Sequence, residues 1–298
     1  MPSDLIFEEI HCKTVLNRVS VPGMRFSWSI NPYRGCQHAC VYCFARGTHN
    51  YLGYDSGRDF ETRIIVKINA TEVLREELRR QDRPKESVLL GTACDPYQQA
   101  EAKYFITQGI VKALTQFAQP VHMLSKSPLV LRDLDLWQGL AAVTRCFIGF
   151  SVPTLDEQIW RKLEPGTAKP MKRLLAMRQL VDAGVRCGVM LAPIVPGLTD
   201  DEHHLSEVMR SARDCGASFI GANVLHLQPG TKEWFMPALR DAYPHLLPRY
   251  EKFYRGSYAP RTYTQDVLAK VDELRDRFGF HEADMKAEEP RGQLRMAI

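Results

Sequence analysis

Six short apolar segments alternate along the chain with stretches of helical periodicity, and this alternation restricts the fold more than any other feature. Each segment is a nearly continuous run of β-branched, aromatic or small apolar residues, as expected for strands covered on both faces. Strands that alternate with helices form parallel sheets with right-handed crossovers. We therefore expect an α/β fold, built as an open doubly wound sheet or as a curled partial barrel. The predicted strands are Phe26–Ile30, Val88–Ala93, Val121–Ser125, Arg145–Val152, Arg186–Val195 and Phe219–Leu227.

The segments between these strands carry helix signals. In Pro170–Ala183 the apolar residues share one face, and Gly184 suits the C-terminal stop. Arg173 is expected on the exposed surface of this helix. A capping box at Thr199-Asp-Asp-Glu202 predicts the start of the next helix. Further helices are predicted over Ala70–Arg80, Lys103–Phe117, Leu129–Leu140 and Ala259–Phe278.

Composition narrows the class of protein. Of the 298 residues, 45% are hydrophobic and 25% are charged, and the net charge of +4 is well below that of a dedicated nucleic-acid binder. Residues Met1–Ser20 contain no basic-then-apolar leader, and no run reaches the ~18 apolar residues that a membrane span needs. We therefore expect a cytoplasmic protein with reduced thiols and no membrane partner.

Three cysteines, Cys36, Cys40 and Cys43, follow the first predicted strand with the spacing Cys-x3-Cys-x2-Cys. In a parallel α/β fold, functional groups lie on the loops after the C-terminal ends of the strands. A four-iron cluster is usually held by four thiolates, so three thiolates leave one iron open for chemistry. Gly35 lets the backbone turn closely around a bulky cluster. Tyr42 supplies an aromatic wall beside it, and Arg34 and Arg46 are expected to offset the cluster's negative charge.

A structural zinc site is the alternative interpretation of the cysteine motif. Zinc takes four soft ligands, and His38 or the distant Cys12 could supply the fourth. Structural zinc usually comes from paired Cys-x2-Cys units, whereas this chain contains one such pair. The iron–sulfur interpretation is therefore favoured.

The cysteine motif with an aromatic residue before its last cysteine resembles the radical S-adenosylmethionine (SAM) superfamily. Other segments resemble its spore photoproduct lyase-like branch, described as DNA repair photolyase-related, and within it an uncharacterised, largely actinobacterial subgroup. The likeness runs from about Phe7 to Tyr263. The segments that carry it are Arg34–Arg46, Asp95–Gln98 with Glu101, Ser125–Ser127 with Arg132 and Asp133, Leu163–Pro165, and Ala192–Gly197.

The resemblance implies a fold and a division of the chain. The fold is a partial (β/α)6 TIM-like barrel of the radical SAM type with N- and C-terminal extensions. Residues 1–22 are then the N-terminal extension, expected to wrap the edge of the core, and 23–258 the radical SAM core. Residues 259–280 form a C-terminal helix, and 281–298 are expected to be a flexible tail.

The resemblance also implies cofactors and a mechanism. A [4Fe–4S] cluster held by Cys36, Cys40 and Cys43 would bind SAM at its open iron. After reduction by a flavodoxin- or ferredoxin-type electron donor, SAM would be cleaved to methionine and a 5′-deoxyadenosyl radical that abstracts hydrogen from the substrate. The protein would bind and orient the reactants and exclude water.

Residues at the ends of the later strands correspond to the SAM-binding positions of the superfamily. Gly91, Thr92 and Asp95 are candidates for the methionine amino group, with a helix cap and turn as the plain alternative. Lys126 is a candidate for the methionine carboxylate or the ribose, with a solvated lysine as the alternative. Ser151 is expected at the ribose and Val195 against the adenine.

Two residues are candidates for radical chemistry and one for substrate contact. Cys94 lies where the family commonly has threonine, and its thiol could return a hydrogen atom; a small buried thiol is the alternative. Tyr97, like Tyr42, is a weaker candidate for radical transfer, because tyrosines near a cofactor commonly only pack. His226 ends the last strand and could touch substrate.

The substrate is the least determined part of the sequence analysis. Arg255, Tyr258, Arg261 and Tyr263 interleave basic and aromatic side chains, a pattern that suits phosphate contact and base stacking. A nucleic acid is therefore one candidate substrate. The alternatives are radical modification of a protein or a small metabolite, and a non-catalytic zinc-binding β/α module.

Overall fold

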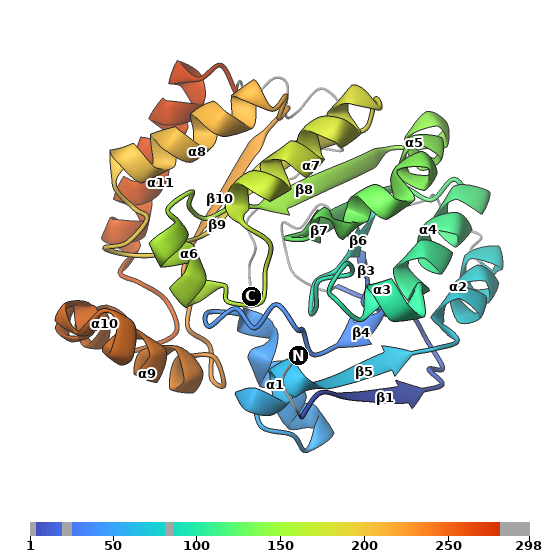
Figure 1. The fold of residues 1–298 in the computed structure, drawn as a ribbon, viewed down its shortest axis with the longest axis horizontal. Helices are drawn as coiled ribbons and strands as arrows, with labels where there is room; N and C mark the ends of the chain where they lie inside the picture. Colours follow the sequence, from blue (N-terminus) through green and yellow to red (C-terminus); the bar gives the residue numbers. More distant parts are fainter. Residues whose placement is uncertain (1–3, 20–25, 81–85, 281–298) are drawn as a thin grey trace.

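The computed structural model describes residues 4–19, 26–80 and 86–280, and a seven-stranded sheet forms their centre (Figure 1). The strand order is β10-β9-β8-β7-β6-β3-β2, in which β2 is antiparallel to β3 and the other neighbours are parallel. The parallel strands follow one another in sequence order, which confirms the predicted alternation. Their bounds are β3 Trp28–Ile30, β6 Val88–Leu90, β7 Val121–Ser125, β8 Cys146–Ser151, β9 Arg186–Ile194 and β10 Ile220–Val224, and the edge strand β2 is Leu16–Arg18.

Helices cover the outer side of this sheet, and the strands form an arc inside them (Figure 1). β10 and β2 are the two ends of the strand order and do not pair with each other, so the barrel is open. The predicted partial barrel of the α/β class is confirmed. The covering helices are α2 Ala70–Arg79, α4 Ile106–Gln116, α5 Leu134–Val143, α7 Pro170–Asp182, α8 Glu202–Asp214 and α11 Arg261–Arg277.

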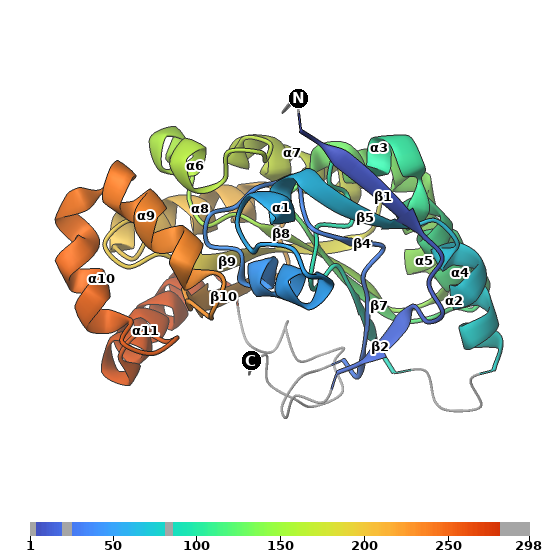
Figure 2. The ribbon, with the colours of Figure 1, turned by 90° about the horizontal axis from the view of Figure 1, so that it is seen from below.

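A second, small sheet lies at the open side of the arc (Figures 1 and 2). Its order is β1-β5-β4, with β1 Ile6–Ile10 parallel to β5 Arg63–Lys67 and β4 Tyr33–Arg34 antiparallel to β5. The sequence analysis did not predict this sheet, because two-residue and five-residue strands give little periodicity. β4 leads directly into the cysteine motif, so the small sheet positions the start of that loop.

Shorter elements complete the chain between the main strands and helices. Two of them, α9 and α10, contact each other and follow β10 in sequence. The shorter elements are η1 Phe44–Leu52, α1 Arg58–Thr62, α3 Glu101–Tyr104, η2 Pro128–Asp133, α6 Glu157–Leu163, α9 Lys232–Ala242, η3 Pro244–Leu246 and α10 Leu247–Phe253.

Three helix predictions need correction. The segment predicted as one helix over Lys103–Phe117 divides at Phe105, whose φ of 53° is left-handed, into α3 and α4. The segment Leu129–Leu140 begins as the 3-10 helix η2 before α5. The N-cap of α8 is Asp201, whose carboxylate accepts from the His204 amide at 3.0 Å. Thr199 is buried, and its hydroxyl instead accepts from the Val195 amide at 2.8 Å.

The boundaries of the extensions and the core remain predictions. β1 lies within the predicted N-terminal extension and pairs with β5, as expected of a segment at the core edge. The predicted flexible tail, residues 281–298, lies outside the described residues. Across residues 4–19, 26–80 and 86–280, none of the helices combines the length and apolar character needed to cross a membrane.

Candidate active site

One mainly apolar cavity of about 380 Å³ collects most of the residues that the sequence singled out. Its walls come from the cysteine loop and from the C-terminal ends of β6, β7, β8, β9 and β10. The predicted site residues that line it are Cys36, Cys40, Cys43, Gly91, Thr92, Cys94, Asp95, Lys126, Ser151 and His226. Active sites of parallel α/β folds lie at this edge of the sheet.

The cysteine loop is held by backbone contacts from several elements. Gly35 has a φ of 79°, and a Cβ built there would lie 2.8 Å from the Arg63 carbonyl oxygen, so only glycine fits. Gln98 accepts from the Gln37 amide at 2.9 Å and donates to the Gly35 carbonyl at 3.0 Å. These contacts fix the shape of the loop.

Two further contacts come from the segment after α6. The Val41 amide donates to the Leu163 carbonyl at 3.0 Å, and the Gly166 amide donates to the His38 carbonyl at 3.0 Å. A Cβ at Gly166 would lie only 2.2 Å from the Gln37 carbonyl oxygen. This glycine thus lets two backbone segments approach closely at the cysteine motif.

Arg46 lies next to the cysteine motif, where burial raises the pKa of Cys43 and the Arg46 charge lowers it. Its guanidinium is fully buried and donates to the Cys40 carbonyl from Nε at 3.1 Å and from a terminal nitrogen at 2.9 Å. It also donates to the Gly57 carbonyl at 2.9 Å and pairs with Glu61, and it lies 4.9 Å from the centre of the Trp234 ring. Its observed contacts hold the backbone of the cysteine loop.

The three cysteine side chains suit a cluster rather than a single ion. Cys36 and Cys40 are buried and Cys43 is partly buried. Burial raises the pKa of all three thiols, so they stay protonated until a bound positive charge stabilises the thiolates. Within the described part of the chain, no three His, Cys, Asp or Glu side chains converge closely enough to hold one metal ion. The three thiols line one cavity, and a set of three thiolates suits a four-iron cluster whose fourth iron is open.

Of the two fourth ligands considered for zinc, His38 lines the cavity with the cysteines but lies against Asp95, and Cys12 does not line the cavity. The His38 Nδ1 atom lies 3.2 Å from the Asp95 Oδ2 atom. Cys12 is not among the residues that line the cavity, and its amide donates to Asn69 at 2.8 Å. Neither side chain completes a four-ligand set with the motif.

Asp95 joins three loops at the cavity edge. Its carboxylate accepts from the Ser125 hydroxyl at 2.8 Å, the Lys126 amide at 2.6 Å and the Tyr97 amide at 2.8 Å. Burial raises the pKa of Asp95, but His38 and these donors outweigh it and hold the pKa below its usual range. These hydrogen bonds from the protein show that Asp95 stabilises the turns around it. Its observed contacts therefore match the alternative given in the sequence analysis, in which the residue caps a helix or turn.

Lys126 and Ser151 meet at the cavity wall. The Lys126 Nζ atom donates to the Ser151 hydroxyl at 2.6 Å, lies 3.7 Å from the Glu164 carboxylate, and lies 5.8 Å from the centre of the Tyr42 ring. The Lys126 side chain is 15% exposed, so the plain alternative of a solvated lysine is wrong. Its ammonium group is placed in the cavity with room for a bound anion or hydroxyl.

Arg173 and Glu164 form a buried ion pair behind these residues. Arg173 was predicted at the helix surface, but it is fully buried and also donates to the Ser151 carbonyl at 2.8 Å. Burial raises the pKa of Glu164, but Arg173, Lys126 and the Tyr42 hydroxyl outweigh it and keep the pKa below its usual range. Sequence reasoning missed this pair, because arginine is seldom buried and its partner lies in another segment.

Thr92 and Cys94 lie against a residue that the sequence analysis did not single out. Asn31 donates to the Thr92 hydroxyl at 2.8 Å and accepts from the Ala93 amide at 2.7 Å. The Cys94 sulfur lies 4.0 Å from the Asn31 side-chain oxygen, and burial raises the pKa of this thiol to about 12. Cys94 is therefore a neutral thiol on the cavity wall.

Two predicted residues do not reach the cavity. Tyr97 is fully buried, and its hydroxyl donates to Asp133 at 3.0 Å and accepts from Trp137 at 2.8 Å. Val195 is also fully buried, and the neighbouring residues Ala192 and Pro193 line the cavity instead. The geometry gives no support to a radical-transfer role for Tyr97 or to adenine contact by the Val195 side chain.

The predicted nucleic-acid surface is only partly available. Tyr258 is 53% exposed, whereas the Tyr263 hydroxyl donates to Asp200 at 2.6 Å and its ring packs 5.0 Å from the Phe253 ring. Arg255 and Arg261 are exposed. Tyr258 and the two arginines thus form the accessible part of the set.

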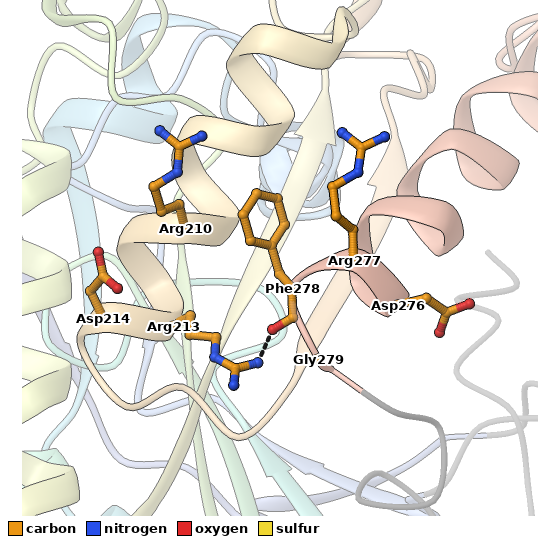
Figure 3. A pocket seen from close by; sticks show the side chains of 7 residues that line it. All are labelled: Arg210, Arg213, Asp214, Asp276, Arg277, Phe278 and Gly279. Carbon is orange, nitrogen blue, oxygen red and sulfur yellow. Dashed lines mark hydrogen bonds between the residues drawn. The ribbon is translucent and has the colours of Figure 1, made fainter.

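A second cavity lies between α8 and the end of α11 (Figure 3). Arg213 donates to the Phe278 carbonyl, Arg277 pairs with Glu202 at 2.5 Å, and Arg210 lies 5.9 Å from the Phe278 ring. Because the arginines already have partners and none of the predicted site residues lines this cavity, it is not the candidate active site.

Comparisons with known proteins agree with the fold and identify the superfamily. The chain is 40% identical over 272 residues to an uncharacterised protein of Mycobacterium tuberculosis, covering 91% of this chain and 80% of that protein. It is 26% identical over 180 residues to the radical SAM Nalpha-GlyT isomerase of Pseudomonas phage M6, covering 59% of this chain and 35% of that one.

Among solved structures, spore photoproduct lyase complexed with dinucleoside spore photoproduct has a TM-score of 0.67 at 16% identity, covering 91% of this chain and 79% of that one. Residues 30–209 match the family model of the Radical SAM superfamily. Members of that superfamily use a [4Fe–4S] cluster and SAM, which confirms the predicted cofactors. Because the match spans more than half of the chain, the protein belongs to the radical SAM superfamily.

Proposed function

We propose that this chain is an enzyme that cleaves SAM reductively at a [4Fe–4S] cluster held by Cys36, Cys40 and Cys43. The observation that carries the proposal is that these three thiols share one cavity with five of the residues predicted to bind SAM, namely Gly91, Thr92, Asp95, Lys126 and Ser151. When bound, the two cofactors supply a 5′-deoxyadenosyl radical, formed with one electron from a flavodoxin- or ferredoxin-type donor, that abstracts hydrogen from the substrate.

The chain's own residues would position SAM by charge and hydrogen bonding. The Lys126 ammonium would face the methionine carboxylate or a ribose hydroxyl, and the Ser151 hydroxyl lies next to it at 2.6 Å. The Glu164–Arg173 pair behind them fixes both groups, because Glu164 lies 3.7 Å from the Lys126 ammonium and Arg173 binds the Ser151 carbonyl. Gly91 and Thr92 line the wall beside the cysteines and would meet the methionine amino group.

Cys94 is the candidate for returning a hydrogen atom to a substrate radical. It lines the cavity, and its raised pKa keeps the hydrogen on sulfur at neutral pH. A neutral thiol is the form that can donate a hydrogen atom. This role distinguishes Cys94 from the three cluster cysteines, which must lose their protons to bind iron.

The reaction class is proposed to be lyase-like, with a nucleic acid as the first candidate substrate. The spore photoproduct lyase structure contains a dinucleoside spore photoproduct, and this chain has two exposed arginines close in sequence to an exposed tyrosine. A protein or a small metabolite is the alternative. We propose a cytoplasmic location, where a soluble reductant is available.

Anaerobic reconstitution with iron and sulfide tests the central proposal. We expect about four irons and four sulfides per chain, brown protein absorbing near 400 nm, and formation of 5′-deoxyadenosine and methionine after reduction. Colourless protein that retains one zinc ion and does not cleave SAM would show that the motif is structural.

A further inference from the structure

His226 lines the cavity and carries a buried ring nitrogen that has no hydrogen-bond partner among the described residues. The residue is 8% exposed, and the nitrogen without a partner is Nε2. A buried polar atom without a partner costs stability, and native proteins satisfy nearly all such atoms. The position therefore calls for a ligand group that completes the hydrogen bond.

The tautomer of His226 indicates which kind of ligand group fits. Burial lowers the pKa of the His226 imidazole, and a hydrogen bond to the Val224 backbone raises the pKa by a smaller amount. The ring is therefore neutral at neutral pH. Because Nε2 has no partner, the hydrogen bond to Val224 is made by the other ring nitrogen, Nδ1. This bond raises the pKa of the ring, so Nδ1 carries the proton and donates to the Val224 carbonyl oxygen. Nε2 is then an acceptor, and it needs an N–H or O–H donor.

Two exposed aromatic rings flank this imidazole. The Phe44 ring centre lies 5.9 Å from the His226 ring centre, and the Tyr258 ring centre lies 6.0 Å from it. Phe44 is 42% exposed and Tyr258 is 53% exposed, so both rings near His226 are accessible to a partner. Phe44 follows the last cysteine of the motif, so the rings lead from solvent toward the metal-binding loop.

The position of Tyr258 is fixed by its neighbours. His226 and Tyr258 form an antiparallel backbone bridge, and the Leu227 amide donates to the Ser257 carbonyl at 2.7 Å. Gln228 donates to the Tyr258 hydroxyl at 3.2 Å. The exposed ring is therefore held in place, as a stacking surface requires.

Positive charge lies on either side of Tyr258. Arg255 and Arg261 are exposed, and neither forms an ion pair with another described residue. By contrast, Arg249 on α10 lies 3.7 Å from the Asp200 carboxylate. Two exposed arginines, each three positions from an exposed tyrosine and without an ion pair among the described residues, favour a substrate that carries both planar rings and regularly spaced negative charges.

We propose that Phe44, His226 and Tyr258 form the substrate-docking slot of the proposed enzyme and that it takes a base of a single-stranded nucleic acid. The base stacks on the exposed rings, an amino or ring N–H group on its edge donates to His226 Nε2, and Arg255 and Arg261 contact the flanking phosphates. The slot deepens the proposed function, since it names the substrate class for the same cavity.

Fluorescence anisotropy on the reconstituted protein tests the slot with two labelled probes. One is a mixed-sequence 12-nucleotide single-stranded DNA, and the other is an abasic strand of the same length. We expect the base-bearing strand to bind about tenfold more tightly. Phe44→Ala and Tyr258→Ala should each reduce this preference about tenfold, whereas Tyr51→Ala is the matched control, because Tyr51 is 88% exposed on the same 3-10 helix as Phe44.

Two further sets of variants separate the parts of the slot. His226→Phe keeps an aromatic ring but removes the acceptor, so it should weaken binding of the base-bearing strand only. Arg255→Gln and Arg261→Gln should weaken both probes equally and each reduce the slope of log K against log salt by about 0.7. If Tyr258→Ala, a surface substitution, leaves the preference intact, the slot is wrong.

Other outcomes separate failure of the slot from failure of the proposed function. Equal binding of the two probes by wild-type protein that cleaves SAM overturns the slot alone. Base-selective binding by protein that assembles its cluster but does not cleave SAM overturns the proposed function and supports the slot. If Tyr258→Ala lost SAM binding, the aromatic rings of the slot would belong to the SAM site. That result would also overturn the proposal that the slot binds a nucleic-acid base.

Discussion

The Tyr42 hydroxyl donates a hydrogen bond to the Glu164 carboxylate, although 122 residues separate them in sequence. Tyr42 lies between two cysteines of the motif, and Glu164 follows α6. The same carboxylate pairs with Arg173 on α7 and lies 3.7 Å from the Lys126 ammonium after β7. One buried carboxylate thus joins the cluster loop to the residues proposed to bind SAM.

Removing the charge of Glu164 should destabilise the protein strongly. In Glu164→Gln the fully buried Arg173 guanidinium loses its counter-charge, and removal of one partner of a buried pair typically costs about 3–5 kcal/mol. Urea unfolding of the two proteins measures the difference. Glu157→Gln is the matched control, because its pairs with Lys169 and Arg161 are exposed and should contribute nothing measurable.

The same pair predicts a pH dependence with a definite sign. The pKa of Glu164 in the folded protein is held below its ordinary value of 4.5, so the carboxylate stabilises the folded state above that pH. This contribution is lost as the pH falls below about 4.5 toward the folded-state pKa. The difference in unfolding free energy between wild type and Glu164→Gln should therefore shrink from pH 6 to pH 3. A difference that stays constant across this range would contradict the assignment.

A methyl group at Gly166 should disturb the cysteine loop. The new Cβ would lie 2.2 Å from the Gln37 carbonyl oxygen, so the loop has to move. We expect Gly166→Ala to lose about 1–3 kcal/mol of stability and to take up less iron on reconstitution. Gly139→Ala is the control: Gly139 lies in α5 with open space around its Cβ position, and alanine there should add up to about 1 kcal/mol. Equal iron content in the two variants would show that this close approach is not required.

The main strands and helices could be predicted because their signals are local. Pro170–Ala183 was predicted as a helix and α7 spans Pro170–Asp182, since proline, apolar spacing and a terminal glycine all lie within the segment. The burial of Arg173 could not be predicted, because it depends on Glu164, Ser151 and Thr167 from outside the helix.

In the candidate site, too, some features could be predicted from the sequence and others depend on residues far apart in the chain. The cysteine motif was predicted from its spacing, Lys126 and Ser151 became candidates through the resemblance to the superfamily, and the structure brings all of them to one cavity. The contacts of Asn31 with Thr92 could not be predicted from the sequence, because they join residues that are 61 positions apart. Tyr97 is two residues from Asp95, which lines the cavity, but the Tyr97 hydroxyl lies away from the cavity and accepts from Trp137.

Lys126→Met should weaken SAM binding with little change in iron content. The substitution keeps the length of the side chain but removes the ammonium group that would contact the methionine carboxylate or ribose. A hydrogen bond to a charged group contributes about 1.5–3 kcal/mol, which corresponds to a 10- to 100-fold higher Kd. Equilibrium dialysis of the reconstituted protein with labelled SAM measures it, and Lys172→Met, on the exposed face of α7, serves as the control. An unchanged Kd would remove Lys126 from the proposed site.

The open coordination position can be tested by comparing cysteines of the same cavity. Alanine at Cys36, Cys40 or Cys43 should abolish cluster assembly and SAM cleavage, because two remaining thiolates cannot hold the four-iron cluster. Cys94→Ala should retain about four irons, since the proposal leaves one iron without a protein ligand. Cys146→Ala controls for the loss of a buried thiol, because Cys146 lies in β8 outside the cavity. Iron analysis and absorbance near 400 nm measure all five variants. Loss of iron in Cys94→Ala but not in Cys146→Ala would make Cys94 a fourth ligand, and the site could then no longer offer an open iron to SAM.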